Sequence, residues 1–168
     1  MSDFNRTTRE CSVSQLQPEI FHAMRNYFQK KNLGNLETET VMCCETVSTK
    51  KNVGGLFSQF TPSIDTTIYT GIVLTSEWLI WVRSGDTSGP LLSAANLNDI
   101  AVNTYKSMFV MDAGLEIIGY IGDSKLVVRG YVGMGPEPAT QKFCDEVKQA
   151  IIKKNPPKPR TWPKWFGG

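Results

Sequence analysis

The stretch that most constrains the fold runs from Thr67 to Arg83 and reads TIYTGIVLTSEWLIWVR. Its first half has the two-residue period of a strand, with one side formed by Ile68, Thr70, Ile72 and Leu74. A second apolar run, Trp78–Val82, follows the polar pair Ser76-Glu77, so the stretch predicts a β-hairpin. Trp78 and Trp81 are three residues apart and should therefore lie on opposite faces of their strand. The hairpin establishes an antiparallel β core and names no activity.

Length and composition predict one globular domain. A chain of 168 residues can bury roughly 70% of its unfolded surface, which is enough to fold without a disulfide or a metal. Hydrophobic residues make up 40% of the chain and charged residues 20%, as in ordinary globular proteins. The net charge of +2 is too small to predict a nucleic-acid partner.

The cysteines do not form a metal-binding motif. Cys11, Cys43, Cys44 and Cys144 include no C-x-x-C pair, and His22 is the only histidine. Cys43 and Cys44 are adjacent and would point to opposite faces of a strand, which is poor geometry for a bond between them. The first residues lack the apolar run of a signal peptide, and no apolar run reaches transmembrane length. We therefore expect a cytoplasmic protein with reduced, structural thiols and no cofactor.

The chain begins with a polar segment, residues 1–17, which we expect to be a flexible lead. Pro18 and Gly34 then bracket a helix, because proline suits the first turn and glycine the position past the end. Its apolar stripe comprises Ile20, Phe21, Met24, Tyr27 and Phe28. His22 lies beside this stripe, where a structural or solvated role is expected rather than catalysis.

Short β-prone runs fill the middle of the chain. Residues 91–105 are expected to supply one long or interrupted strand, and a hairpin is expected around the three-residue turn Gly122-Asp123-Ser124. After Gly135 an amphipathic helix should run to about Lys154, carrying Phe143, Val147, Ala150 and Ile151. The predicted order is a helix, six or seven antiparallel strands, a helix and a proline-rich tail.

This order resembles the pleckstrin-homology (PH) superfold, in which antiparallel strands are closed by one C-terminal helix. The segment Thr70–Thr75 followed by Trp78–Val82 resembles the "G-x-ϕ-x-L-T-x-x-R-ϕ-ϕ-ϕ" stretch of bacterial PH-like and GRAM-type domains, with ϕ apolar. Asn98–Val102 is similar to their following strand. This chain has Trp78 where a basic residue is common, so no contact of that basic side chain is carried over. The resemblance spans roughly residues 39–154.

The resemblance implies a mainly β, α+β domain. We expect a PH-like antiparallel barrel or sandwich of six or seven strands, capped by the C-terminal helix and preceded by an added N-terminal helix. The domain should cover residues 18–154, leaving residues 155–168 as a Pro-rich, basic-aromatic tail.

The tail is the sharpest chemical feature. Its basic and aromatic side chains suit an anionic membrane surface, an acidic protein groove or an apolar patch on this or a neighbouring subunit. The candidate binding residues are Lys158, Arg160, Trp162, Lys164, Trp165 and Phe166. Lys50 and Lys51 are weaker candidates for a lipid headgroup, because the basic cluster of phosphoinositide-binding PH domains lies between the first two strands and here lacks its R-x-R part.

No catalytic motif is present in the sequence. There is no G-x-S-x-G, P-loop or H-E-x-x-H, and the acids Asp112, Glu116 and Asp123 are expected to be solvated residues near turns. We expect a non-enzymatic interaction module that binds a protein partner or associates with itself as a homo-oligomer. The alternative is a peripheral binder of anionic lipid headgroups through the tail, and an enzyme of unknown type comes third.

Overall fold

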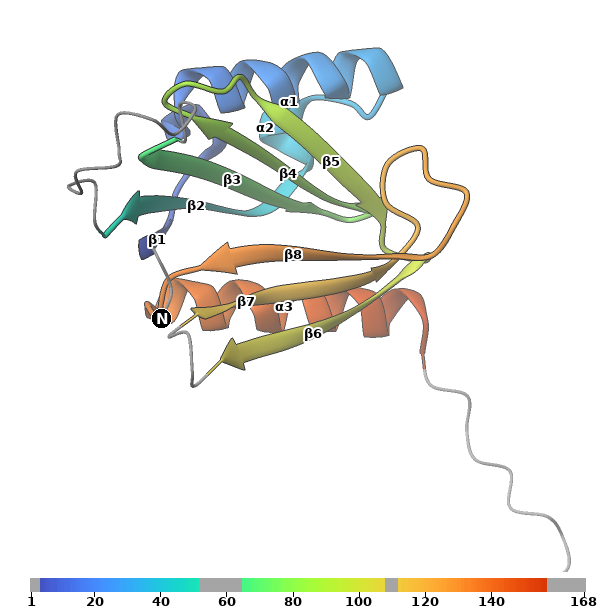
Figure 1. The fold of residues 1–168 in the computed structure, drawn as a ribbon. Coiled ribbons are helices and arrows are strands. Elements are labelled where there is room, and N and C mark those ends of the chain that lie inside the picture. The colour runs from blue at the N-terminus through green and yellow to red at the C-terminus, as the bar shows by residue number, and fades with distance from the viewer. Residues whose placement is uncertain (1–3, 52–64, 108–111, 157–168) are drawn as a thin grey trace, which may run out of the picture.

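The computed structural model describes residues 4–51, 65–107 and 112–156, and Figure 1 shows their arrangement. The elements are β1 (Phe4–Glu10), η1 (Val13–Gln15), α1 (Pro18–Lys31), α2 (Leu36–Glu39), β2 (Thr40–Lys50), β3 (Thr67–Thr75), β4 (Trp78–Gly85), β5 (Leu91–Asn96), β6 (Ile100–Ser107), β7 (Asp112–Gly119), β8 (Val128–Met134) and α3 (Pro138–Lys154). The prediction of a mainly β, α+β chain with flanking helices is confirmed. The described residues form eight strands, where six or seven were expected.

The strands form two antiparallel sheets, and neither is closed. One has five strands in the order β1-β2-β3-β4-β5, and the other has three in the order β6-β7-β8. The predicted hairpin is confirmed as β3 and β4, with Leu74 opposite Leu79 next to the turn. Thr75 Oγ1 accepts hydrogen bonds from the backbone N–H groups of Glu77 and Trp78 at 3.2 and 2.9 Å, and so stabilises the turn.

The expected strand over residues 91–105 is interrupted, and its two parts belong to different sheets. After β5 the Asn96 side chain accepts the N–H of Asn98 at 3.0 Å, which turns the chain. Leu97 is fully buried at this turn, and β6 then starts the second sheet. The alternation of residues 100–105 predicted the strand correctly but contained no information about the change of sheet.

The expectation of a flexible lead is wrong for residues 4–17. Residues Phe4–Glu10 form β1, which pairs with β2 along its whole length. Thr8 is buried and its hydroxyl lies 2.7 Å from that of Thr46. The strand was missed because β1 is an edge strand that buries one residue only, so its composition is that of a polar loop.

The second hairpin, β7 and β8, is connected by residues 120–127 and not by a three-residue turn. Gly122 has φ +61°, a conformation that favours glycine, and its N–H donates to the carbonyl oxygen of Ala94 in β5 at 2.7 Å. The connection is longer than predicted because it leaves its own hairpin to contact the edge of the other sheet.

Two hydrophobic clusters lie on the two faces of the five-stranded sheet. The outer-face cluster packs α1 on the sheet through Ile20, Met24 and Phe28. Gly71 of β3 permits this approach, since a Cβ there would stand 2.6 Å from Ile20 Cγ2. In Figure 1, α1 and α2 cover one face of this sheet, while the second sheet and α3 lie on the other.

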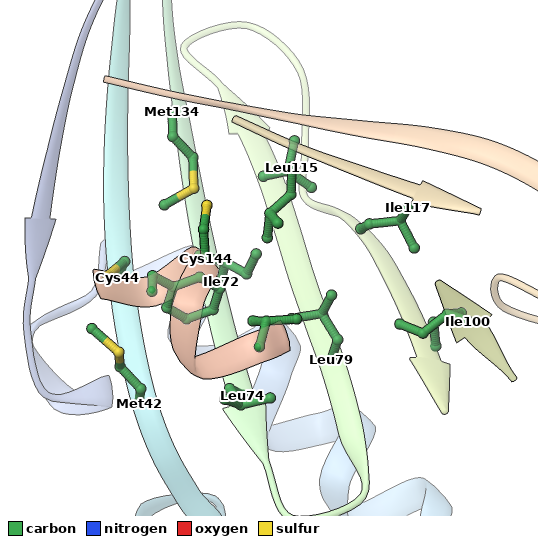
Figure 2. Close-up of a cluster of buried hydrophobic side chains, with 14 of the residues drawn as sticks. Met42, Cys44, Ile72, Leu74, Leu79, Ile100, Leu115, Ile117, Met134 and Cys144 are labelled. Carbon is green, nitrogen blue, oxygen red and sulfur yellow. The ribbon is translucent and has the colours of Figure 1, made fainter. Parts of the chain in front are cut away.

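The inner cluster fills the space between the two sheets and α3. Figure 2 shows side chains from both sheets and α3 meeting there, among them Ile72, Leu79, Leu115 and Cys144. Trp78 and Trp81 lie on opposite faces of β4, as predicted. Each is partly buried, Trp78 against the outer-face cluster and Trp81 against the inner one. No helix in the described part of the chain has the length and apolar character needed to cross a membrane.

Candidate functional site

The tail residues proposed from the sequence lie outside the described residues. These are Lys158, Arg160, Trp162, Lys164, Trp165 and Phe166. Lys50 and Lys51 are described: Lys50 ends β2 opposite Phe4 of β1, and Lys51 is exposed just beyond it. His22 is exposed on α1, with its ring 5.7 Å from that of Phe21.

A cleft of about 420 Å³ lies between the two sheets, beside the inner cluster. This volume falls within the range of small-ligand sites. We call it the inter-sheet cleft, and its lining residues are Phe4, Arg6, Ser48, Ile68, Thr70, Trp81, Arg83, Leu91, Ser93, Tyr105, Tyr131, Val132 and Gly133. All five strands of the larger sheet contribute, and β6 and β8 of the smaller sheet close the other side.

The cleft arises because the inner face of the large sheet changes character along its strands. On β4 the inward positions are Leu79, which is fully buried, then half-buried Trp81, then exposed Arg83. On β3 the corresponding sequence runs from buried Ile72 to Thr70, which pairs with Arg83. The strands keep their alternation, but beyond the part that the second sheet and α3 cover, the inward residues include polar as well as apolar side chains.

Two arginines on different strands line the cleft. Arg6 comes from β1 and Arg83 from β4, and the described lining residues include no Asp or Glu. Arg6 lies over Gly133 of β8, where a Cβ would stand 2.8 Å from its guanidinium carbon. Glycine at this position therefore leaves room for the guanidinium between the sheets.

Glu116 of β7 is bonded to Tyr131, one of the residues that line the cleft. Glu116 accepts hydrogen bonds from Asn103 at 3.0 Å and Tyr131 at 3.2 Å, and lies 3.3 Å from Arg129. The Asn103 hydrogen bond, with the charge of Arg129, lowers the pKa of Glu116. Tyr131 in turn packs edge-on against Tyr105 with ring centroids 5.6 Å apart. Glu116 therefore holds the aromatic wall in place and has its own basic neighbour.

These groups can bind an anion that carries an apolar part. Guanidinium groups form paired hydrogen bonds with carboxylates and phosphates, and Trp81 with the two tyrosines offers aromatic surface. The hydroxyls of Ser48, Thr70 and Ser93 add polar contacts. The described lining contains no His, Cys, Asp, Glu or Lys. Among the described residues, no three metal-ligating side chains gather.

Sequence reasoning missed both arginines. Arg83 could have been found, because it ends the predicted hairpin and shares its alternation with Trp81. Arg6 could not, since the segment that carries it was assigned to a flexible lead. Its proximity to Gly133 depends on a contact between the two ends of the chain.

Comparison with known proteins identifies no relative, as the chain matches no family model, no curated protein and no solved structure. The inter-sheet cleft and the sequence features described above therefore provide the basis for a functional proposal.

Proposed function

We propose that this protein is a non-catalytic, PH-like interaction module that binds an acidic segment of a protein partner in the inter-sheet cleft. The observation that carries the proposal is the exposed Arg83 on the wall of the cleft, near Trp81, with no acid among the described lining residues. The order of the elements, with two antiparallel sheets followed by one helix, supports the PH-like part.

An extended peptide suits this cleft better than a compact solute. Leu91 and Ser93 line it from β5, which is an edge strand of the larger sheet. Edge strands can pair with an added peptide strand, whose alternate side chains then enter the adjoining pocket. A carboxylate of such a peptide would pair with Arg83, and a neighbouring apolar side chain would lie against Trp81.

The test is a fluorescence-anisotropy titration with a short labelled peptide in which two glutamates flank a phenylalanine. Arg83→Ala should weaken binding about ten- to hundredfold, because a charge-assisted hydrogen bond is lost. Arg25→Ala is the matched control: it removes the same charge from α1, where Arg25 lies 6.0 Å above the Phe21 ring. Equal affinities for the two variants would contradict binding in the cleft.

Self-association remains a second form of the same proposal, because this chain has exposed acids of its own at Glu37 and Glu39 on α2. A size-exclusion run on the full chain at low and high salt would detect it. If the arginines mediate the contact, the oligomer should dissociate as salt rises and should be absent in Arg83→Glu.

Binding to an anionic membrane is the alternative, and the composition of the tail favours it. Basic residues next to tryptophan suit the headgroup region, where each Lys or Arg contributes about 1 kcal/mol. Co-sedimentation with phosphatidylserine vesicles would compare the full chain with a variant in which Trp162, Trp165 and Phe166 are alanine. Retention of the full chain alone would favour a cytoplasmic module with peripheral membrane contact over the protein-partner proposal.

Turnover of a substrate in the cleft would instead favour an enzyme.

A further inference from the structure

Two thiols meet where β1 ends and the chain turns toward η1. Cys11 lies opposite Cys43, one step beyond the pairing of Glu10 with Cys44, and the Cys11 N–H donates to the Cys43 carbonyl oxygen at 3.1 Å. The two Sγ atoms are 3.9 Å apart. Directly opposed residues of an antiparallel pair have Cα atoms about 4.5–5.5 Å apart, which lies within the range that a disulfide spans. Side-chain rotation can therefore bring the sulfurs into bonding distance.

The two thiols have different environments. Cys43 is 3% exposed in the outer-face cluster, whereas Cys11 is half-buried at the edge of that cluster. A hydrogen bond with Cys43 lowers the pKa of Cys11, and the positive charge of Arg9 acts in the same direction. The same hydrogen bond, together with burial, raises the pKa of Cys43. Cys11 is thus the thiol that a solvent-borne reagent meets and the one that ionises first.

We propose that Cys11 and Cys43 form a reversible disulfide, with a small soluble disulfide such as oxidised glutathione as the oxidant. Cys11 loses its proton to water, and the resulting thiolate attacks one sulfur of the oxidant to form a mixed disulfide. The S–S bond of the oxidant breaks and releases one glutathione thiolate, which is protonated by water. Cys43 then attacks Cys11 Sγ, transfers its proton to the second departing glutathione thiolate and completes the protein disulfide. The two cysteines lose two electrons in total, and the oxidant gains them.

The bond would fasten the edge strand β1 to β2, with which it pairs in the described part of the larger sheet. It would close a loop over residues 11–43, which contains α1, and would restrain the end of β1 next to η1. The other two cysteines are matched controls, because Cys44 and Cys144 are buried in the inner cluster and are at most 1% exposed. This inference does not depend on what the inter-sheet cleft binds.

The experiment treats the folded full chain with oxidised glutathione and maps its peptides without reduction. Trypsin leaves Cys43 and Cys44 on one peptide, so Cys44→Ala is used to assign the bond. The proposal expects a linked Cys11–Cys43 peptide, lighter by two hydrogen atoms, in the wild type, Cys44→Ala and Cys144→Ala. Cys43→Ala should instead retain glutathione on Cys11, and Cys11→Ser should give neither product.

Thermal unfolding of the same samples provides a second readout. The oxidised wild type should melt about 5–10 °C higher than the reduced protein, because the cross-link restricts the unfolded chain. Cys11→Ser replaces a half-buried residue, and its melting temperature should not rise on oxidation. Absence of the linked peptide in Cys44→Ala, or an equal shift in Cys11→Ser, would overturn the proposal. Recovery of the original melting temperature after reduction would establish reversibility, and its failure would contradict a reversible bond.

Discussion

The inner face of the five-stranded sheet has two halves that use the same strands differently. In the closed half, Ile72 and Leu79 are fully buried beneath the second sheet and α3. In the open half, further along β3 and β4, Thr70 and Arg83 line the inter-sheet cleft. Trp81 lies at the boundary and belongs to both. Different positions along the same strands therefore stabilise the fold and bind the ligand. Substitutions in the closed half should lower stability, and substitutions in the open half should weaken binding.

The largest expected effect is in the closed half. Phe143→Ala should lower the free energy of unfolding by about 3–5 kcal/mol, because Phe143 is fully buried in the inner cluster and its removal leaves a cavity. Urea denaturation monitored by tryptophan fluorescence measures this loss. Arg83→Ala, in the open half, should change the free energy of unfolding by about 0.5 kcal/mol or less. Similar losses from both variants would remove the distinction between the halves.

The next effect tests the junction that holds β1 over the cleft. Thr8 Oγ1 lies 2.7 Å from the hydroxyl of Thr46 and accepts the N–H of Gly135 at 2.7 Å. Thr8→Val should cost about 2 kcal/mol, since it leaves buried polar groups without a partner. Thr8→Ser keeps the hydroxyl and should retain most of the stability in the same urea titration. A neutral Thr8→Val variant would show that this network does not hold β1.

A smaller effect is expected when a negative charge is added to the open half. Ser93→Asp should weaken binding of the acidic peptide about tenfold, or about 1.4 kcal/mol, because the aspartate would repel the ligand and pair with an arginine. Ser93→Asn has a similar size and no charge, so it should bind nearly as the wild type does. The anisotropy titration distinguishes them, and tighter binding by Ser93→Asp would mean that the cleft does not select anions.

The smallest effect concerns the far end of the open half. Asp65 accepts the N–H groups of Thr87 and Ser88 at 2.7 and 3.0 Å and also bonds their hydroxyls, and these hydrogen bonds hold the pKa of Asp65 well below its usual range. Because the pKa of Asp65 is lower in the folded than in the unfolded state, its hydrogen bonds stabilise the fold at pH values above the unfolded-state pKa. This stabilisation is lost as the pH falls through the folded-state pKa. Acidification should therefore lower the protection factors of the Thr87 and Ser88 amides, taken relative to the intrinsic exchange rate at each pH, before it affects the closed half. Asp65→Asn should show fast exchange at neutral pH, and protection that persists in it would contradict this role.

The sequence predicted elements better than it predicted their assembly. Alternation around Ile72 identified the hairpin, and the bracketing Pro18 identified α1, because both signals are local. The strand β1 was missed because it buries only Thr8, and the change of sheet at Leu97 left no mark on the hydrophobic pattern. The tail residues lie outside the described residues, so the structure does not test them as a binding site.

The cleft could not be predicted, because its two arginines come from β1 and β4, which are far apart in the sequence. Arg83 belongs to a run whose alternation was correctly assigned, but its partner in charge, Arg6, reaches the site only through the fold. Gly133 makes room for the Arg6 side chain, a role that appears only once the two strands are brought together. Such roles depend on contacts between distant parts of the chain, which single-sequence patterns do not record.

The contact between the two ends of the chain bears on how the protein is made. Thr8 donates its N–H to Glu137 and accepts the N–H of Gly135, and both partners precede α3. During synthesis, β1 leaves the ribosome first, but these partners emerge only when most of the chain is complete. The larger sheet can pair as soon as β5 is made, whereas the wall of the cleft that β8 provides must wait. A ribosome stalled before residue 135 should therefore hold a nascent chain with a folded outer layer and an unfinished binding site.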